Sequence, residues 1–248
     1  MDKKYCDIIH LSQVSSTNEY MKELVRRDKP AEGTIVFTDH QTAGKGIDSN
    51  TWESEAGKNI LMSVVCYPAF IPVENQFRIS MAIGLGIKDF LKSHLPHEKI
   101  MIKWPNDILA GGKKIAGILI VNEISGSKFE HLIAGIGLNV NQLTFSEDIP
   151  DPTSMAILTG ISFDLEEETL KLRDCVLLRY EQLREGMWEL IRTDYYSSLL
   201  GLNESRIYRY KGNEINAVIT GVDEFGRLQL ETDSGNIVCD LKEISFIL

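Results

Sequence analysis

The chain has 248 residues, of which 43% are hydrophobic and 25% are charged. These values are ordinary for a globular protein with one large domain, or with one large domain and a small appendage. Lys and Arg number 26 against 36 Asp and Glu, and the formal net charge of −10 disfavours general binding to nucleic acid. The apolar runs are far shorter than the ~20 residues of a membrane span, and no secretory signal follows Met1.

Neither the cysteines nor the histidines are spaced as metal ligands. Cys6, Cys66, Cys175 and Cys239 are widely scattered, without a zinc pattern or a Cys-x-x-Cys pair. The chain is therefore expected to be a reduced, cytoplasmic protein that binds no membrane.

The first hundred residues predict strands and helices on either side of a long polar segment. The expected elements are a strand at 7–14, a helix from Ser16 to about Arg27, strands at 34–38 and 59–67, and a helix at 74–95. Ser16 and Glu19 have the spacing of a helix capping box. Residues 39–58 predict no regular structure, and a segment of that length inside a compact domain is usually functional.

Strand signals then continue up to one long helical segment. The expected elements are strands at 100–104, 114–122 and 131–140, a Gly111-Gly112 hairpin turn, and one helix over 164–191. This order predicts an α+β fold, with a mixed, largely antiparallel sheet flanked by helices.

The character of the chain changes near Glu204. Short β segments at 215–221, 227–232, 237–241 and 244–248 alternate with turn residues and predict a small β-barrel. We therefore expect a catalytic domain over 1–203 and a barrel domain over 204–248.

Three segments have the composition of binding sites. Gly44-Lys45-Gly46 could direct backbone N–H groups and one cation at an anion, although a flexible surface loop explains it equally well. Polar groups could meet at the end of a strand through Lys103-Trp104-Pro105-Asn106-Asp107 and the later Lys114. The same residues could instead be a plain turn and a solvated lysine. The glycines of Gly135-Ile136-Gly137 permit close approach of a ligand, although a β-bulge is the simpler explanation.

Taken together and in this order, the motifs resemble those of the biotin protein ligases over nearly the whole chain. They are Ser16-Thr17-Asn18, Gln41 with the Gly-Lys-Gly loop ending at Trp52-Glu53-Ser54, Gly57-Lys58-Asn59, Lys103-Trp104-Pro105-Asn106-Asp107, the segment 114–119, the segment 135–141 and Pro152-Thr153-Ser154-Met155. The resemblance implies a catalytic core like that of class II synthetases and a reaction in two steps. Biotin and ATP, with Mg²⁺, give biotinyl-5′-AMP, and a lysine of a biotin carboxyl carrier domain then takes the biotin.

The resemblance also implies roles for individual residues. Lys114 and Lys45 are the expected catalytic residues. The expected biotin-binding residues are Ser16, Thr17, Asn18, Gln41, Lys45, Gly46, Ile47, Lys114 and Gly117. The expected ATP-binding and adenylate-binding residues are Gly44, Lys45, Trp52, Asn106, Lys114 and Asn139. It identifies no metal ligands.

The chain departs from the family pattern in two places. Many relatives have Gly-Arg-Gly-Arg-x-x-Arg in the loop, whereas this chain has Ile47 and Asn50 at two arginine positions and adds Asp48. The adenylate is then either held less tightly or held with help from a group such as Lys58. The catalytic pattern also begins by residue 7, which leaves no room for an N-terminal winged helix and predicts a monofunctional ligase, as monomer or homodimer.

Two other functions would fit parts of this pattern. A lipoate ligase or octanoyl transferase would share the core sheet and a lysine near the carboxylate. A non-catalytic biotin sensor would explain the depleted loop. The Lys-Trp-Pro-Asn-Asp block and the C-terminal segment favour biotin, and Lys114 with the Gly-Lys-Gly core favours catalysis.

Overall fold

The computed structural model describes residues 7–47 and 50–247. The elements are β1 Ile8–Leu11, α1 Thr17–Asp28, β2 Ile35–Thr38, β3 Asn59–Cys66, a 3₁₀ helix Val73–Asn75, α2 Phe77–His94, β4 Ile100–Lys103, β5 Asp107–Ala110, β6 Lys113–Ser125, β7 Lys128–Asn139, α3 Met155–Thr159, α4 Leu165–Arg184, α5 Trp188–Ser198, β8 Ser205–Tyr210, β9 Asn213–Val222, β10 Leu228–Thr232, β11 Gly235–Cys239 and β12 Ile244–Phe246.

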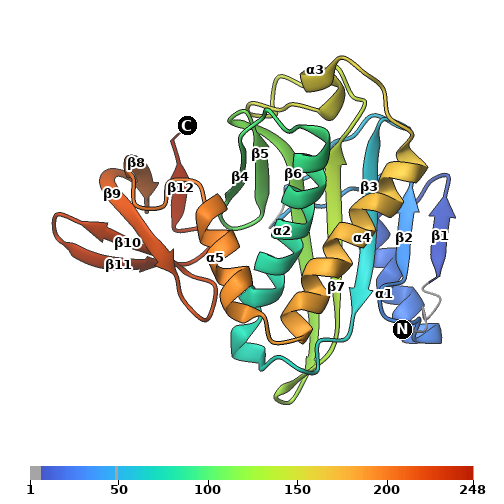
Figure 1. The fold of residues 1–248 in the computed structure, drawn as a ribbon, viewed down its shortest axis with the longest axis horizontal. Helices are drawn as coiled ribbons and strands as arrows, with labels where there is room; N and C mark the ends of the chain where they lie inside the picture. The colour runs from blue at the N-terminus through green and yellow to red at the C-terminus, as the bar shows by residue number, and fades with distance from the viewer. Residues whose placement is uncertain (1–6, 48–49, 248) are drawn as a thin grey trace.

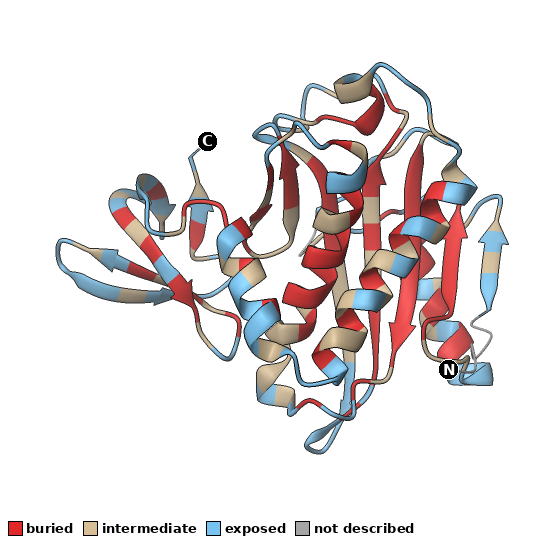
Figure 2. Ribbon diagram, in the orientation of Figure 1, coloured by how far each residue is buried: buried red, intermediate tan, exposed pale blue. Residues whose placement is uncertain are grey.

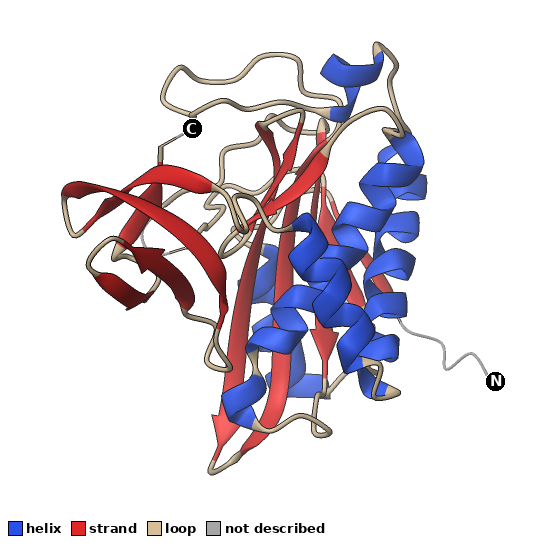
Figure 3. Ribbon diagram, turned by 60° about the vertical axis from the view of Figure 1, so that its left-hand side comes forward, coloured by secondary structure: helices blue, strands red, loops and turns tan. Residues whose placement is uncertain are grey.

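The strands form two sheets, which Figure 1 shows side by side. The larger has the order β1-β2-β3-β7-β6-β5-β4 and is antiparallel except for the parallel pair β1 and β2. Helices α2, α4 and α5 lie together on one side of it (Figure 3). The prediction of an α+β fold with a largely antiparallel sheet is confirmed.

The two faces of the large sheet differ because side chains alternate along each strand. On β7, Leu132, Ala134, Ile136 and Leu138 belong to the main core, together with side chains of α2 and α4. Ile133 points the other way and packs with Met21, Leu24 and Val25 of α1. In Figure 2, β2, β3 and the inner side of α2 are the most continuously buried elements. Helix α1 packs against β2, β3 and β7, so among the described elements no helix covers the same face over β6 and β5 to a comparable extent.

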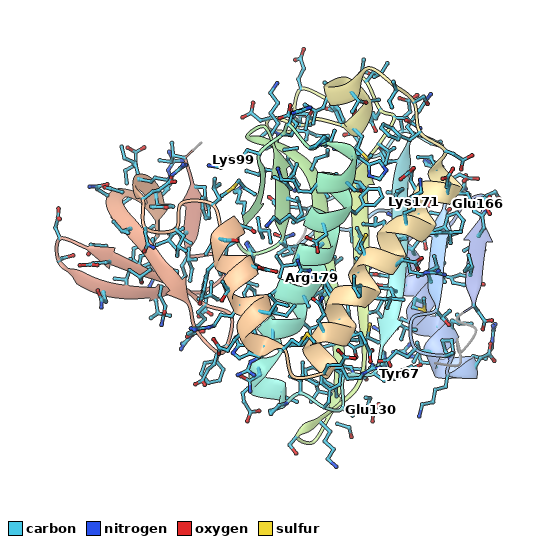
Figure 4. All side chains as sticks on the ribbon, in the orientation of Figure 1. Tyr67, Lys99, Glu130, Glu166, Lys171 and Arg179 are labelled. Atoms are coloured by element: carbon cyan, nitrogen blue, oxygen red, sulfur yellow. The ribbon has the colours of Figure 1, made fainter. Side chains whose placement is uncertain are left out.

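The helical segment predicted as one helix over 164–191 is two helices, so that prediction was wrong. The chain turns at Gly186, which has a φ of +80°, a conformation that glycine adopts at little cost. Apolar spacing continues through this turn because both helices bury residues on the same sheet. Arg179 of α4, labelled in Figure 4, ties the helical layer together. Its guanidinium lies 2.5 Å from Asp89 of α2 and 2.7 Å from Asp194 of α5.

The C-terminal segment is a five-stranded antiparallel sheet in the order β11-β10-β9-β8-β12. Among the described residues, β11 and β12 are its edges and do not pair with each other, so the expected barrel is not closed. The sequence also missed β8, whose Arg206 and Arg209 interrupt the apolar pattern. Trp104, just after β4, donates from its indole Nε1 to the carbonyl oxygen of Gly226 at 2.9 Å and so joins the two sheets.

Candidate active site

Glycines form the floor of a cavity on the free face of the large sheet. Gly117 of β6 lies opposite Gly137 of β7, and Gly135 lies between Leu119 and Ser63 of the two neighbouring strands. A Cβ atom at Gly137 would lie 2.4 Å from the Trp52 ring, and one at Gly135 would lie 2.5 Å from Asn18 Oδ1. Glycine is therefore required here by close approach of other side chains, and the simpler explanation as a β-bulge is wrong for these two positions.

Polar side chains at the start of α1 form one wall. The hydroxyl oxygen of Ser63 lies 2.7 Å from both Thr17 Oγ1 and Asn18 Oδ1. Gln41 Oε1 accepts from the Thr17 amide at 2.8 Å, and Asn18 Nδ2 donates to the Leu119 carbonyl at 3.1 Å. These side chains are held before any ligand binds, because each already has a partner within the protein.

The capping box predicted at this helix does not form. Ser16 occupies the N-cap position, but its side chain makes no capping hydrogen bond. Glu19 instead accepts from Lys45 Nζ at 2.8 Å, and this bond holds the pKa of the Glu19 carboxyl below its ordinary value. The cation of the Gly-Lys-Gly loop is thus paired with α1 across the mouth of the cavity.

In the polar segment after β2, the residues before the tip pair with the residues after it. Lys45 and Thr51 form an isolated antiparallel bridge, and the Trp52 amide donates to the Gly44 carbonyl at 3.0 Å. The Trp52 ring then lies on Gly117 and Gly137, with its buried Nε1 unpaired among the described residues. Asp48 and Ser49 at the tip lie outside the described residues.

A β-bulge brings Lys114 onto the floor. Leu109 pairs with Lys114 and Ile108 with Ala116, so Ile115 has no partner on β5. Without the bulge, Lys114 and Gly117 would face opposite sides of the sheet, because they are three positions apart and side chains alternate along a strand. With it, the Lys114 side chain lies against Gly117, at 3.8 Å from the position of an added Cβ.

The backbone and the amine of Lys114 are both held. Its amide donates to the Asp151 carbonyl at 2.8 Å, and its carbonyl accepts from the Thr153 amide at 2.9 Å. Its Nζ lies 2.7 Å from Asp107 Oδ1 and 5.6 Å from the centre of the Trp52 ring.

Lys114 stands between two cavities. The first has a volume of about 260 Å³ and includes the glycine floor, the wall from α1 and the loop. The second, of about 440 Å³, lies between the loop after Asn50 and the segment 148–152. Trp52, Asp107 and Lys114 line both. An ammonium group at such a junction can contact anionic groups of two ligands at once.

Two family profiles match this chain. Residues 11–139 match the biotin/lipoate A/B protein ligase family, and residues 207–246 match the biotin protein ligase C-terminal domain. The chain belongs to the biotin protein ligase family.

Individual relatives agree with this assignment. The bifunctional ligase/repressor BirA of Bacillus spizizenii is 31% identical, over 92% of this chain and 70% of its own length. The biotin–[acetyl-CoA-carboxylase] ligase of Mycobacterium tuberculosis is 28% identical, over 94% of this chain and 86% of its own length. The biotin protein ligase from Aquifex aeolicus, in complex with biotin and ATP, superposes with a TM-score of 0.79 at 27% identity, covering 97% of this chain and 98% of that one.

Most residues predicted for a biotin protein ligase site meet in the first cavity. They are Ser16, Thr17, Asn18, Gln41, Lys45, Gly46, Ile47, Trp52, Asn106, Lys114 and Gly117. Asn139 instead lines the second cavity, where its Nδ2 donates to the Thr153 carbonyl at 3.0 Å. Gly44 lines neither cavity, and it lies directly against the backbone of Trp52. Lys58, suggested as a substitute for the lost arginines, is also absent from both.

The sequence did not reveal what holds Lys114 in this site. It placed Asp107 among possible binding groups at the end of a strand but did not pair it with Lys114, and it gave no function to residues 151–153, which hold the Lys114 backbone. The pairing of acid and lysine across β5 and β6 could have been found from the hairpin, had the bulge been known.

No ready metal site is present in the part of the chain that the structure describes. It contains no group of three or more His, Cys, Asp or Glu side chains that could hold a metal ion. Within the same residues, no helix has the length and apolar composition needed to cross a membrane.

Proposed function

We propose that this chain joins biotin to ATP, giving biotinyl-5′-AMP and pyrophosphate, and then transfers biotin to a lysine of a biotin carboxyl carrier domain. The observation that supports this most is the position of Lys114 at the junction of two cavities. The similar ligase from Aquifex aeolicus was solved with both biotin and ATP.

The first cavity suits biotin. Its glycine floor and the apolar side chain of Leu119 can take a flat, largely apolar bicycle and its chain. Ser16, Thr17, Asn18 and Gln41 supply donors and acceptors for the ureido group of the ring. Gly117 keeps the floor low, and Gly46 with Ile47 covers the end where the carboxylate lies.

The second cavity suits ATP. Trp52 and Asn139 line it, and Gly44 holds Trp52 in place. Asn106 belongs to the first cavity, next to this one, where its Nδ2 donates to the Ile118 carbonyl at 3.0 Å. Lys45 approaches from the loop, once it leaves Glu19.

Lys114 acts at the place where negative charge builds up during adenylate formation. A carboxylate oxygen of biotin attacks the α-phosphorus, the bond to the bridging oxygen breaks, and pyrophosphate leaves. The ammonium group reduces the repulsion between carboxylate and phosphate and stabilises the charge on the phosphoryl oxygens in the transition state. Transfer follows when the neutral amine of the carrier lysine attacks the acyl carbon and AMP leaves with the electron pair of the broken bond.

Mg²⁺ would enter with ATP rather than occupy a site of its own. Mg²⁺ keeps several waters and commonly binds through substrate phosphates and one or two carboxylates. Asp107 lines both cavities, but its two carboxylate oxygens already face the ammonium groups of Lys114 and Lys103. The metal would contribute neutralisation of the pyrophosphate charge.

The domain boundary belongs to the same proposal. We place the catalytic domain at 1–203 and the C-terminal domain at 204–248. The start of β8 at Ser205 and the second family match at residue 207 support this division.

Lipoate is the main alternative substrate, and the match of residues 207–246 to the biotin protein ligase C-terminal domain favours biotin. Thermal-shift titration with biotin and with lipoate separates them. A ligand stabilises the folded state by RT ln(1 + [L]/Kd), so biotin is expected to raise the melting temperature far more than lipoate at equal concentration. A larger shift with lipoate would reverse the assignment.

The decisive experiment is labelling of a carrier domain that depends on both biotin and ATP, detected by mass spectrometry. Pyrophosphate release in the absence of the carrier tests the first step alone. Biotin binding without any pyrophosphate release would instead favour a non-catalytic sensor.

A further inference from the structure

We propose that Asp107 is a positioning residue for adenylate formation. It takes one of the three N–H donors of Lys114 and directs the other two at the biotin carboxylate and the α-phosphate. This inference rests on the proposed function, and part of its test is independent of turnover.

The carboxylate of Asp107 is shared between two lysines. Its Oδ1 lies 2.7 Å from Lys114 Nζ, and its Oδ2 lies 3.6 Å from Lys103 Nζ. The Asp107 side chain is 16% exposed, and those of Lys103 and Lys114 are 24% and 31% exposed. A partly buried ion pair is screened less by water than a surface pair, so its geometry is held more firmly.

Both ends of the pair start from fixed backbone. Asp107 is the first residue of β5 and pairs with Gly117 on the floor. Lys114 is held at its amide and its carbonyl by Asp151 and Thr153. Only the flexible stem of the lysine remains free, and an ammonium on four carbons has no preferred direction by itself.

The number of N–H donors on the Lys114 ammonium group determines how the group is oriented. An ammonium group has three N–H bonds and no acceptor. With one bond occupied by Asp107 on the wall common to both cavities, the remaining two point away from that wall. Those two bonds match the two anions that the reaction must bring together.

The carboxylate also balances charge. Lys103 lines the second cavity beside Lys114, and two ammonium groups without an acid between them would repel each other. One carboxylate with two lysines leaves a net charge of +1, which still attracts phosphate. Asp107 thus positions the two ammonium groups and leaves the pair of lysines with a net positive charge.

The test compares Asp107→Asn, Lys114→Ala and the double variant with the wild type. Asp107→Asn is expected to slow single-turnover pyrophosphate release by about 10-fold to 100-fold, as misplacement of a catalytic group does. The Kd for biotin, measured by calorimetry, should change less than about threefold, because the ring contacts are untouched. Glu204→Gln, which breaks the exposed pair with Arg206, is the matched control and should leave both values unchanged.

The double variant separates positioning from a structural role. If Asp107 acts through Lys114, then Asp107→Asn should have almost no further effect on the rate in the Lys114→Ala background. Equal slowing in both backgrounds, or no slowing in the single variant, would overturn the proposal.

A measurement without turnover covers the case in which the proposed function itself fails. With ¹⁵Nζ-labelled lysine, the Lys114 ammonium should give an observable ¹H–¹⁵N signal, because its bond to Asp107 protects it from exchange. The signal is assigned by its loss in Lys114→Ala and should also vanish in Asp107→Asn. Its absence in the wild type, or its persistence in Asp107→Asn, contradicts the pairing whatever reaction the protein catalyses.

Discussion

The ammonium group of Lys114 is the cation common to the two cavities at their floor. Lys114→Ala should keep the fold and lose adenylate formation by at least ~100-fold, because it removes an electrostatic stabiliser of the transition state. Single-turnover pyrophosphate release gives the rate, and circular dichroism checks the fold. An unchanged rate would exclude this role.

Ile47 stands where many relatives have an arginine. Retention of biotinyl-AMP depends on charge-assisted hydrogen bonds from the loop, each worth ~1.5–3 kcal/mol. Ile47→Arg should therefore slow release of the bound adenylate by about tenfold or more, while Lys45→Ala should speed it. Asp48→Asn should slow it less. The dissociation rate without carrier protein is the measurement, and equal rates for Ile47→Arg and wild type would show that this side chain does not face the phosphate.

At the level of single residues, the sequence predicted which types of side chain the site uses but not how they interact. Lys114, Asn18 and the glycines at 117 and 137 could be assigned through motifs. The pairs Lys114 with Asp107 and Lys45 with Glu19 could not, because each joins separate elements and depends on their distance in space.

At the scale of the strands, the glycines of the cavity floor lead to a specific prediction about biotin binding. Gly135→Ala would place a Cβ 2.5 Å from Asn18 Oδ1 and break the network with Ser63. The Kd for biotin should rise by about tenfold or more, the loss expected when one or two hydrogen bonds are disrupted. Gly84→Ala in α2 is the control, since its Cβ would meet only ordinary contacts at 3.5 and 3.8 Å. Unchanged biotin affinity in Gly135→Ala would refute the prediction.

The loop over residues 44–52 should be more protected when the site is filled. The Lys45–Thr51 bridge and the Trp52 ring already hold part of it, and ligand contacts at Lys45 and Gly46 would add to these. Cleavage by trypsin after Lys45 should slow on addition of biotin and ATP. Cleavage after Lys128, in the β6–β7 hairpin, serves as reference and should not change. Equal protection of Lys45 in both states would contradict the prediction.

The sequence identified most of the strands and helices but not their local irregularities. Helical spacing of apolar residues located α2, and largely apolar runs located β3 and β7, because these strands are buried over most of their length. The sequence predicted α4 and α5 as a single helix. It also missed the bulge at Ile115, since one extra residue changes which side of the sheet a side chain faces without changing the composition of the strand.

Between the two sheets, the buried indole of Trp104 provides a test of how firmly they are joined. Trp104→Phe would leave the buried Gly226 carbonyl without its donor, at a cost of about 1–3 kcal/mol. The free energy of unfolding in urea should fall by that amount. Trp188→Phe, at a half-buried position on α5, should cost less. A larger loss at Trp188 than at Trp104 would argue against the contact.

The turn after β4 sets a limit on recombination between relatives. Trp104 reaches the Gly226 carbonyl, and Lys103 Nζ lies 5.6 Å from the centre of the Phe246 ring. Two consecutive residues of the first sheet are thus fitted to the second. Lys103 and Trp104 belong to a block that resembles the family pattern, so a C-terminal sheet from another ligase must bring its own carbonyl and its own ring to meet them. A chimera that exchanges residues 204–248 is expected to keep both contacts only where the donor sequence supplies a turn and an aromatic side chain at these two places.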